Sequence, residues 1–153
     1  MLLPVASQYA ICGIVRLAVS SQEGYCQIDD LVEGTTAPEH AVRKTFQQLA
    51  KHRVLRSVRG IRGGFRLAKQ PDEITLMQIV EAVDGPFPAT PWGDNHFWEV
   101  GETCPLARAM QPMWEQLTAY LRNTRISDLI AIAGDPSTVP ANQCTANGGS
   151  LAR

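Results

Sequence analysis

Residues 35–69 read TTAPEHAVRKTFQQLAKHRVLRSVRGIRGGFRLAK, and this stretch decides the fold. In its first half, apolar residues recur near the helical period and predict a helix that runs to about His52. Thr36, with Glu39 three places later, predicts a capping box where this helix begins, and Pro38 suits its first turn. The other face of the helix is polar, so the helix is expected to lie with one side against a core.

The second half of the same stretch predicts a β-hairpin. Residues 54–58 and 65–68 have strand composition, and glycines in the turn between them accept the backbone angles of a tight turn. Upstream, residues 27–33 predict a short helix that Gly34 ends. A short helix, a turn, a second helix with a polar outer face and a hairpin together form the pattern of a winged helix-turn-helix.

Three further helices are expected around this unit. Residues 8–20 have apolar side chains at helical spacing. Thr75 opens a second capping box and a helix that runs to about Val83. A third helix begins near Pro105, and Pro112 either kinks it or marks its true start.

The helix near Pro105 has an apolar seam at three- and four-residue spacing. The seam consists of Leu106, Met110, Met113, Leu117 and Leu121. A seam of this kind is too apolar to stay exposed on a monomer of this size. It predicts a twofold homodimer in which these helices cross, each packing against the first helix of the other subunit.

The charge of the chain is unevenly distributed. The formal net charge is −1, from 14 Lys and Arg residues against 15 Asp and Glu residues. Between His40 and Pro71 there is no acidic residue, and nine of the 14 basic residues lie there: Arg43, Lys44, Lys51, Arg53, Arg56, Arg59, Arg62, Arg66 and Lys69. This density favours a face that binds a polyanion, most simply nucleic acid, over a basic surface paired with acidic neighbours.

Several classes of protein are excluded or disfavoured. The cysteines form no CxxC pair, which excludes a zinc finger. No apolar run reaches the ~20 residues of a membrane span. The N-terminus lacks the basic region of a signal peptide, so we expect a cytoplasmic protein with reduced thiols. An enzyme is not expected, because Cys104 with His96 as base is the one available constellation and no catalytic motif supports it.

Two motifs resemble the Rrf-type winged helix-turn-helix transcriptional regulators. They are SVRGIRGGFRLA at residues 57–68 and ITLMQIVEAVDG at residues 74–85, and the resemblance extends over about residues 6–133. It implies a mainly α fold with a small β-hairpin wing and a long dimerisation helix. It also implies a bacterial, sequence-specific DNA-binding regulator, a dimeric repressor that binds a pseudo-palindromic operator. A winged-helix module for protein interaction is the alternative.

The resemblance also divides the chain into four parts. Residues 1–84 are the expected winged helix-turn-helix DNA-binding domain, and residues 85–103 are a sensor-type loop. Residues 104–134 form the dimerisation helix region. Residues 135–153 are rich in Pro, Gly, Ser, Thr, Asn and Ala and are expected to be a disordered tail.

Ten residues are the expected contacts with double-stranded DNA. Thr35 and Thr36 at the start of the second helix of the motif are expected to bind phosphate through hydroxyl and N–H groups. The candidates for contact with base edges are His40, Arg43, Lys44 and Gln47. The wing is expected to contact the DNA backbone through Arg59, Arg62, Gly63 and Gly64.

The sensor of this chain departs from the cluster-bearing members of the family, which have three cysteines in the loop before the long helix. The resemblance places Trp92, Trp98 and Cys104 at those positions, and only Cys104 can ligate a metal. One alternative pairs Cys104 with Cys12 of the other subunit, either as ligands of an iron–sulfur cluster or metal or as a reversible disulfide. If the two cysteines act as cluster ligands, the cofactor is an iron–sulfur cluster. If they form a disulfide, the protein has no cofactor.

Two alternatives use the aromatic residues of the loop instead. In the first, Trp92, Phe97 and Trp98 form the walls of a pocket for a small effector. In the second, the tryptophans fill the vacated sensor site, and the regulator responds to a protein partner or to nothing. Neither of them requires a metal.

Overall fold

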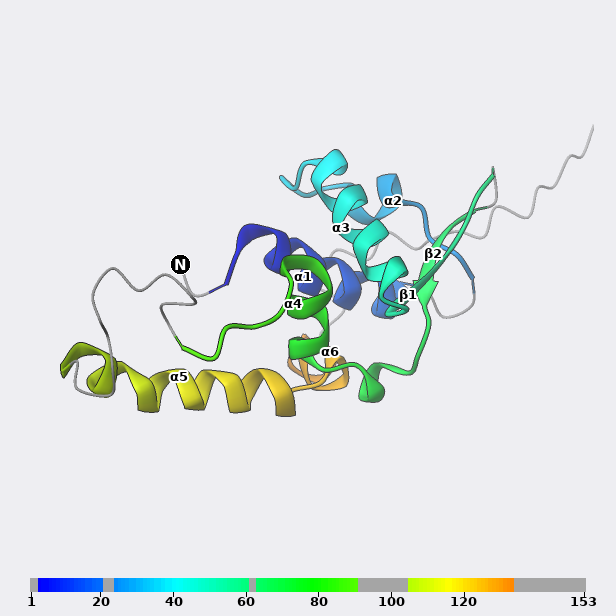
Figure 1. Cartoon of the computed structure of the whole chain (residues 1–153). Helices are drawn as coiled ribbons and strands as arrows, with labels where there is room; N and C mark the ends of the chain where they lie inside the picture. The colour runs from blue at the N-terminus through cyan, green and yellow to red at the C-terminus, as the bar shows by residue number, and fades with distance from the viewer. Residues whose placement is uncertain (1–2, 21–23, 61–62, 91–104, 134–153) are drawn as a thin grey trace, which may run out of the picture.

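The computed structural model describes residues 3–20, 24–60, 63–90 and 105–133 (Figure 1). Its elements in chain order are α1 (Val5–Ser20), α2 (Ile28–Val32), α3 (Glu39–Lys51), β1 (Leu55–Val58), β2 (Gly64–Leu67), the 3₁₀ turn η1 (Pro71–Glu73), α4 (Leu76–Asp84), α5 (Pro105–Asn123) and α6 (Ile126–Ile132). The expected fold class, mainly helical with a two-stranded hairpin, is confirmed. Within these ranges no helix combines the length and the apolar character that crossing a membrane requires.

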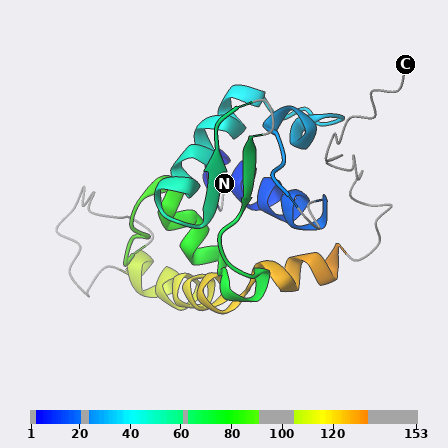
Figure 2. The ribbon, with the colours of Figure 1, turned by 90° about the vertical axis from the view of Figure 1, so that its right-hand side faces the viewer.

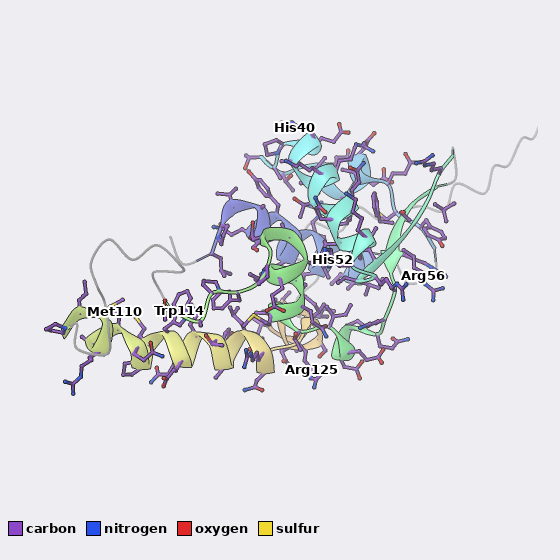
Figure 3. All side chains as sticks on the ribbon, viewed as in Figure 1. His40, His52, Arg56, Met110, Trp114 and Arg125 are labelled. Carbon is purple, nitrogen blue, oxygen red and sulfur yellow. The ribbon has the colours of Figure 1, made fainter. Side chains whose placement is uncertain are left out.

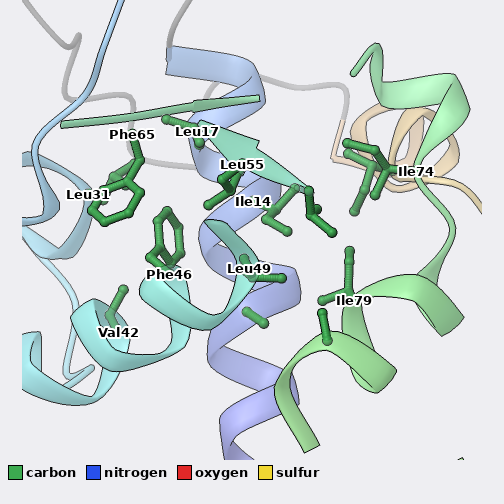
Figure 4. Packing of buried hydrophobic residues seen from close by; sticks show 14 of the residues in the cluster. Ile14, Leu17, Leu31, Val42, Phe46, Leu49, Leu55, Phe65, Ile74 and Ile79 are labelled. Carbon is green, nitrogen blue, oxygen red and sulfur yellow. The ribbon is translucent and has the colours of Figure 1, made fainter. Parts of the chain in front are cut away.

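Helix α1 lies at the centre of the core, with α3 and α4 packed against it (Figure 4). Ile14 of α1 is fully buried, and so is Phe46 of α3. The Phe46 ring meets the Phe65 ring of β2 edge to face, with centroids 5.4 Å apart and planes at 88°. Gly13 of α1 lets the Phe46 ring pack close to this helix, because a Cβ at residue 13 would lie 2.6 Å from Cε2 of Phe46. One aromatic contact thereby connects the helices to the hairpin.

The hairpin β1–β2 is antiparallel, with Leu55 opposite Leu67 and Val58 opposite Gly64. Strand β2 is joined to the segment before α2 by two backbone hydrogen bonds. The Cys26 N–H donates to the Phe65 carbonyl at 2.9 Å, and the Phe65 N–H donates to the Cys26 carbonyl at 2.8 Å. The wing, defined as residues 55–67, is therefore held in position by the chain that leads into the helix-turn-helix.

Helix α3 ends in a Schellman motif. The Val54 N–H donates to the Leu49 carbonyl at 2.9 Å, and the Arg53 N–H donates to the Ala50 carbonyl at 3.1 Å. Arg53 has φ 59°, in the left-handed region that this motif usually fills with glycine. The chain thus reverses within two residues and enters β1 directly.

Helix α4 begins with the expected capping box at Thr75. The Gln78 N–H donates to the Thr75 hydroxyl oxygen at 3.2 Å, and the Thr75 N–H donates to Oε1 of Gln78 at 3.2 Å. Helix α5 runs on the side of the molecule opposite α2 and α3 (Figures 1 and 2). It contains Pro112 and starts at Pro105, so Pro112 does not mark its start.

The apolar seam expected on α5 divides into two parts. Leu121 is 2% exposed and belongs to the core of its own subunit, and Leu117 packs against the same core. Leu106 and Met113 are exposed, and Tyr120 is exposed on the same stripe. The reason is that Leu117 and Leu121 lie on the side of α5 that packs against the core, whereas the exposed residues lie along a second line of the helix, at seven-residue spacing. The exposed stripe is therefore Leu106, Met113 and Tyr120, and Leu121 is not part of it.

Candidate nucleic-acid interface

The turn between α2 and α3 is shaped by Thr35. Its hydroxyl donates to the Val32 carbonyl at 2.7 Å and accepts from the Ala37 N–H at 3.2 Å. The backbone N–H of Thr35 also donates to Val32, at 2.9 Å. Both Thr35 and Thr36 are exposed. The Thr35 hydroxyl thus serves the turn itself, and this use was not expected from the sequence.

Helix α3 does not start with the expected capping box. Its N-cap is Pro38, with no hydrogen bond from a side chain, and the Pro38 carbonyl accepts from the N–H groups of Ala41 and Val42. The carboxylate of Glu39 bonds to Arg43 instead of turning back to Thr36. The capping box was wrong because a charged partner one turn along the helix competes successfully for this carboxylate.

The predicted base-contacting residues share the exposed face of α3. His40 lies at its N-terminal end (Figure 3). The exposed residues on the helix are Glu39, His40, Arg43, Lys44, Gln47 and Lys51. The opposite face is buried and consists of Val42, Thr45, Phe46 and Leu49. The amphipathic pattern therefore presents every one of the four predicted side chains on α3 to solvent.

Arg43 is held by two carboxylates. Its Nη2 donates to Oδ1 of Asp29 on α2 at 3.0 Å and to a carboxylate oxygen of Glu39 on α3. The hydrogen bond from Arg43 lowers the pKa of the Glu39 carboxyl, and the positive charge of Arg43 acts in the same direction. The hydrogen bond to Glu39 likewise raises the pKa of the Arg43 guanidinium. Arg43 therefore lies at the junction of the two helices and links them through two exposed ion pairs.

A surface cleft of about 780 Å³ separates α3 from the wing. On the helix side it is lined by Arg43, Gln47, Ala50 and Lys51, and on the wing side by Ser57, Val58, Arg59, Gly60, Gly63, Gly64 and Phe65. Gln27, Ile28 and Asp29 complete the lining. The structure thus brings together five of the ten predicted DNA-contacting residues, because one short connection joins α3 to β1.

Two glycines of the wing, Gly63 and Gly64, are needed for different structural reasons. The Gly63 N–H donates to the Gly60 carbonyl at 2.9 Å and closes the turn. Gly64 has φ +145°, and a Cβ there would lie 2.3 Å from the Cys26 carbonyl oxygen. Gly64 is therefore required by the joint between the wing and the segment before α2. Arg62 lies outside the described residues.

Two features of the surface were not expected from the sequence. Asp29 pairs with Arg43 across 14 positions, and no local pattern indicates such a contact. Arg56 and Arg66 face each other across the hairpin, and Arg66 lies over the ring of Tyr25. The sequence signal for this second pair is the pairing register of the two strands. Only this register places the two arginines directly opposite each other, and a shift by two residues would separate them.

The predicted sensor residues lie mostly outside the described part of the chain. Cys104, Trp92, Phe97 and Trp98 are all there, whereas Cys12 lies on α1 and is exposed. Residues 3–20, 24–60, 63–90 and 105–133 contain no group of three or more His, Cys, Asp or Glu residues that holds a metal. Indole side chains at positions 92 and 98 do not ligate iron. The donor set therefore does not fit a cluster held by three cysteines.

A helix-turn-helix whose second helix borders a basic hairpin defines the winged helix-turn-helix class of protein. The chain is similar to the solved structure of CymR, the global cysteine regulator of B. subtilis, with a TM-score of 0.69 and 23% identity over 85% of this chain and 96% of that one. It is also similar to the structure of IscR from T. potens, with a TM-score of 0.67 and 18% identity over 86% of this chain and 87% of that one. These likenesses establish the fold.

Sequence comparison identifies the family. Residues 3–132 match the Rrf2 family, described as an iron-dependent transcriptional regulator. The transcriptional regulator IscR from Pectobacterium atrosepticum is 27% identical over 130 residues, which cover 85% of this chain and 79% of that protein. The chain belongs to the Rrf2 family of DNA-binding transcriptional regulators. The resemblance seen in the sequence is confirmed, and so is the expectation that the chain is not an enzyme.

Proposed function

We propose that this protein is a bacterial, dimeric, sequence-specific regulator of transcription that binds a pseudo-palindromic operator in the cytoplasm. The observation that carries the proposal is the cleft of about 780 Å³ between α3 and the wing. Polar and basic side chains border it on both sides, as a duplex backbone and its base edges require. Residues 1–84 act as the DNA-binding domain and residues 104–134 as the dimerisation region.

The side chains have different roles in this proposal. Those on α3 read base edges in the major groove, and they are His40, Arg43, Lys44 and Gln47. Those that contact the DNA backbone are Thr35, Thr36, Arg59, Arg62, Gly63 and Gly64. Asp29 and Glu39 support the first group, because they fix the position of the Arg43 guanidinium.

Dimerisation is proposed to use the exposed stripe of α5. Leu106, Met113 and Tyr120 recur every seven residues, so they lie along one line of the helix. Large apolar side chains in such a line are buried when two helices cross. A twofold axis at this crossing places the two α3–wing clefts on symmetric half-sites about one helical turn of DNA apart, or a multiple of it.

The direction of regulation is proposed to be repression, and the signal is proposed to act on the thiol of Cys104. Cys12 on α1 is the proposed partner, contributed by the other subunit, and its exposure on the surface supports this assignment. Two thiols form a disulfide by giving two electrons and two protons to an oxidant such as a peroxide. A pocket formed by Trp92, Phe97 and Trp98 is the alternative for a signal that involves no metal.

The residues that lead into the sensor-type loop contact α5. This contact supports a mechanism in which a signal in the loop changes the position of α5. Phe87 stacks on Trp114 with ring centroids 4.9 Å apart, and Nε1 of Trp114 donates to the Pro88 carbonyl at 3.0 Å. A change in residues 85–103 therefore bears directly on α5. This contact supports both sensing alternatives equally.

Selection of bound duplexes from a random library tests the main proposal. We expect enriched sites with twofold pseudo-symmetry, and we expect retention on random duplex DNA that falls steeply as salt rises. Failure to retain any duplex at low salt would contradict DNA recognition by this chain. Enrichment of sites without symmetry would contradict the dimeric arrangement alone.

The thiol signal has its own test. Operator affinity is measured for wild type, Cys104→Ser and the double variant Cys104→Ser with Cys12→Ser, each under reducing and oxidising conditions. A coupling between thiol state and DNA affinity is expected to change wild-type affinity by about 5- to 150-fold and to be absent from both variants. Equal affinities for all three proteins in both conditions would favour the tryptophan-lined pocket instead.

A further inference from the structure

The outer face of the wing carries two arginines that lie directly opposite each other. Arg56 of β1 pairs with Arg66 of β2 in the antiparallel register. The alternate residues Leu55 and Phe65 are buried, so Arg56 and Arg66 lie on the face of the hairpin turned away from the core. Directly opposite side chains of an antiparallel pair have Cβ atoms about 5 Å apart, and like charges at this spacing destabilise a hairpin.

Nothing in the described part of the chain neutralises this pair. The two ion pairs among those residues both belong to Arg43. The Arg66 guanidinium lies over the ring of Tyr25, 5.0 Å from its centroid, and its Nε is buried without a hydrogen-bond partner. The Arg56 side chain extends from the hairpin into solvent (Figure 3). The ring therefore holds one guanidinium in place and leaves the charge of both uncompensated.

Two guanidinium groups at this spacing are suited to a single phosphate group. Each presents a planar fork of N–H donors that matches the oxygens of a phosphate. An anion between them converts the repulsion across the hairpin into two favourable ion pairs. The ligand class is therefore a phosphate, either within a nucleic-acid backbone or free in solution.

The position of the pair favours the DNA backbone as the source. Arg59, which lines the cleft between α3 and the wing, is three residues from Arg56. Three residues of strand span about 10 Å, which is more than the distance between neighbouring phosphates along one DNA strand. A phosphate bound at the arginine pair consequently belongs to a part of the duplex beyond the bases that α3 reads.

We propose that Arg56 and Arg66, with Tyr25 beneath Arg66, form a clamp for one phosphate of the DNA that flanks each half-site. This inference rests on the proposed function, because it requires the α3–wing cleft to bind duplex DNA. It adds a contact that carries no sequence information and extends the length of duplex that the protein needs.

The experiment compares two duplexes that share one selected operator. The short duplex ends at the outer edges of the half-sites, and the long one continues for about one helical turn on each side. Affinity and its salt dependence are measured for wild type, for Arg56→Gln with Arg66→Gln, and for the control Arg108→Gln with Arg122→Gln. Both control arginines are exposed on α5, each two residues from a member of the exposed stripe and so on the opposite side of the helix, and the control therefore removes the same charge away from the wing and from the proposed dimer contact.

The clamp variant is expected to lose about tenfold in affinity for the long duplex and less than twofold for the short one, and its salt slope on the long duplex falls by about one per subunit. The control variant keeps the wild-type dependence on duplex length. The clamp variant is also expected to melt at or above the wild-type temperature, because it relieves a like-charge pair. A purely structural role would lower the melting temperature and weaken both duplexes equally, and that result would overturn the clamp.

Free phosphate is separated from DNA by a second arm. Inorganic phosphate at millimolar concentration is added, and thermal unfolding is followed without DNA. A phosphate-dependent rise in melting temperature that the clamp variant lacks, together with unchanged affinity for both duplexes, would overturn DNA as the source. Wild-type protein that binds neither duplex would overturn the proposed function and the clamp together, whereas equal length dependence in all three proteins would overturn the clamp alone.

Discussion

The wing and helix α5 are both exposed, but their surfaces have opposite chemistry. The wing presents Arg56, Arg59 and Arg66, whereas the exposed stripe of α5 presents Leu106, Met113 and Tyr120. The two elements lie on opposite sides of α1 (Figures 1 and 2). The difference supports the proposal that one chain of ordinary composition has two kinds of partner, a polyanion on the wing side and a second copy of itself at α5.

The α5 surface offers the largest expected effect. Leu106→Glu with Met113→Glu places two charges in the exposed stripe, so the proposed dimer should dissociate while the core stays intact. Because two linked half-sites bind far more tightly than one, operator affinity should fall by about 10²- to 10⁴-fold. Analytical ultracentrifugation and a mobility shift measure the two effects.

Ala119→Glu is the matched control for this change. Ala119 is exposed on α5 but lies away from the apolar stripe, so the added charge should leave both the mass in solution and the operator affinity unchanged. A double variant that remains dimeric would show that the stripe is not the interface.

The joint of the wing is expected to be the next most sensitive feature. Gly64→Ala introduces a Cβ that would lie 2.3 Å from the Cys26 carbonyl oxygen, at a φ of +145°. Strain and crowding together should destabilise the fold by about 2–4 kcal/mol in chemical denaturation. Gly60→Ala has a similar strain at φ +113° but nothing within 4 Å, so it should cost only about 1 kcal/mol. Equal costs would show that crowding against Cys26 does not occur.

The two sides of the α3–wing cleft should differ in how they affect specificity. Gln47→Ala should cost about 1–3 kcal/mol on a selected operator and almost nothing on random duplex DNA. Arg59→Ala should weaken binding to both and reduce the salt slope by about 1 for each lost phosphate contact. Fluorescence anisotropy over a range of salt concentrations measures both quantities. If both variants weakened operator and random DNA equally, α3 would not be the reading helix.

The end of α3 offers a stabilising change. Arg53 is in the left-handed region at φ 59°, so Arg53→Gly should remove a steric cost of about 1 kcal/mol and raise the melting temperature. Arg53→Asn, which also loses the charge but tolerates this conformation less well than glycine, should give a smaller gain. If the melting temperature rose as much in the asparagine variant as in the glycine variant, the effect would come from the loss of charge and not from backbone conformation.

The smallest expected effect is the pH dependence of the Glu39–Arg43 pair. The pKa of Glu39 is lowered by its hydrogen bond with Arg43, so the pair contributes fully above the ordinary value of 4.5 and is lost as pH falls through the lowered pKa. NMR titration of the Glu39 carboxyl should show a midpoint below 4.5, and Arg43→Ala should raise that midpoint because the largest cause of the lowered pKa is removed. An unchanged midpoint in the variant would show that Arg43 does not hold this carboxylate in solution.

Much of the fold was readable from local pattern. The hairpin, the helix before it and the capped helix at Thr75 were all predicted, because each depends on residues within a few positions of one another. The polar face of α3 was readable for the same reason. The exposure of the four side chains on α3 was therefore predicted because one element supplies all of them, whereas their contact with DNA stays a prediction.

Contacts between elements were not readable from such patterns. The Thr36–Glu39 capping box fitted the spacing rule, yet Glu39 bonds to Arg43, which in turn reaches Asp29 on another helix. Leu121 fitted the apolar seam of α5 but lies in the core of its own subunit. Periodicity shows which face of a helix is apolar, but it does not show what covers that face.

By itself, the sequence determined the helices, the hairpin and the uneven charge of this protein, because these follow from spacing and composition along the chain. Only the tertiary structure decided that Arg43 is held by two carboxylates, and that α5 buries Leu121 while it exposes Met113 and Tyr120. The physical reason is that a side chain far along the chain competes with a local one on equal terms once folding brings both within hydrogen-bond distance.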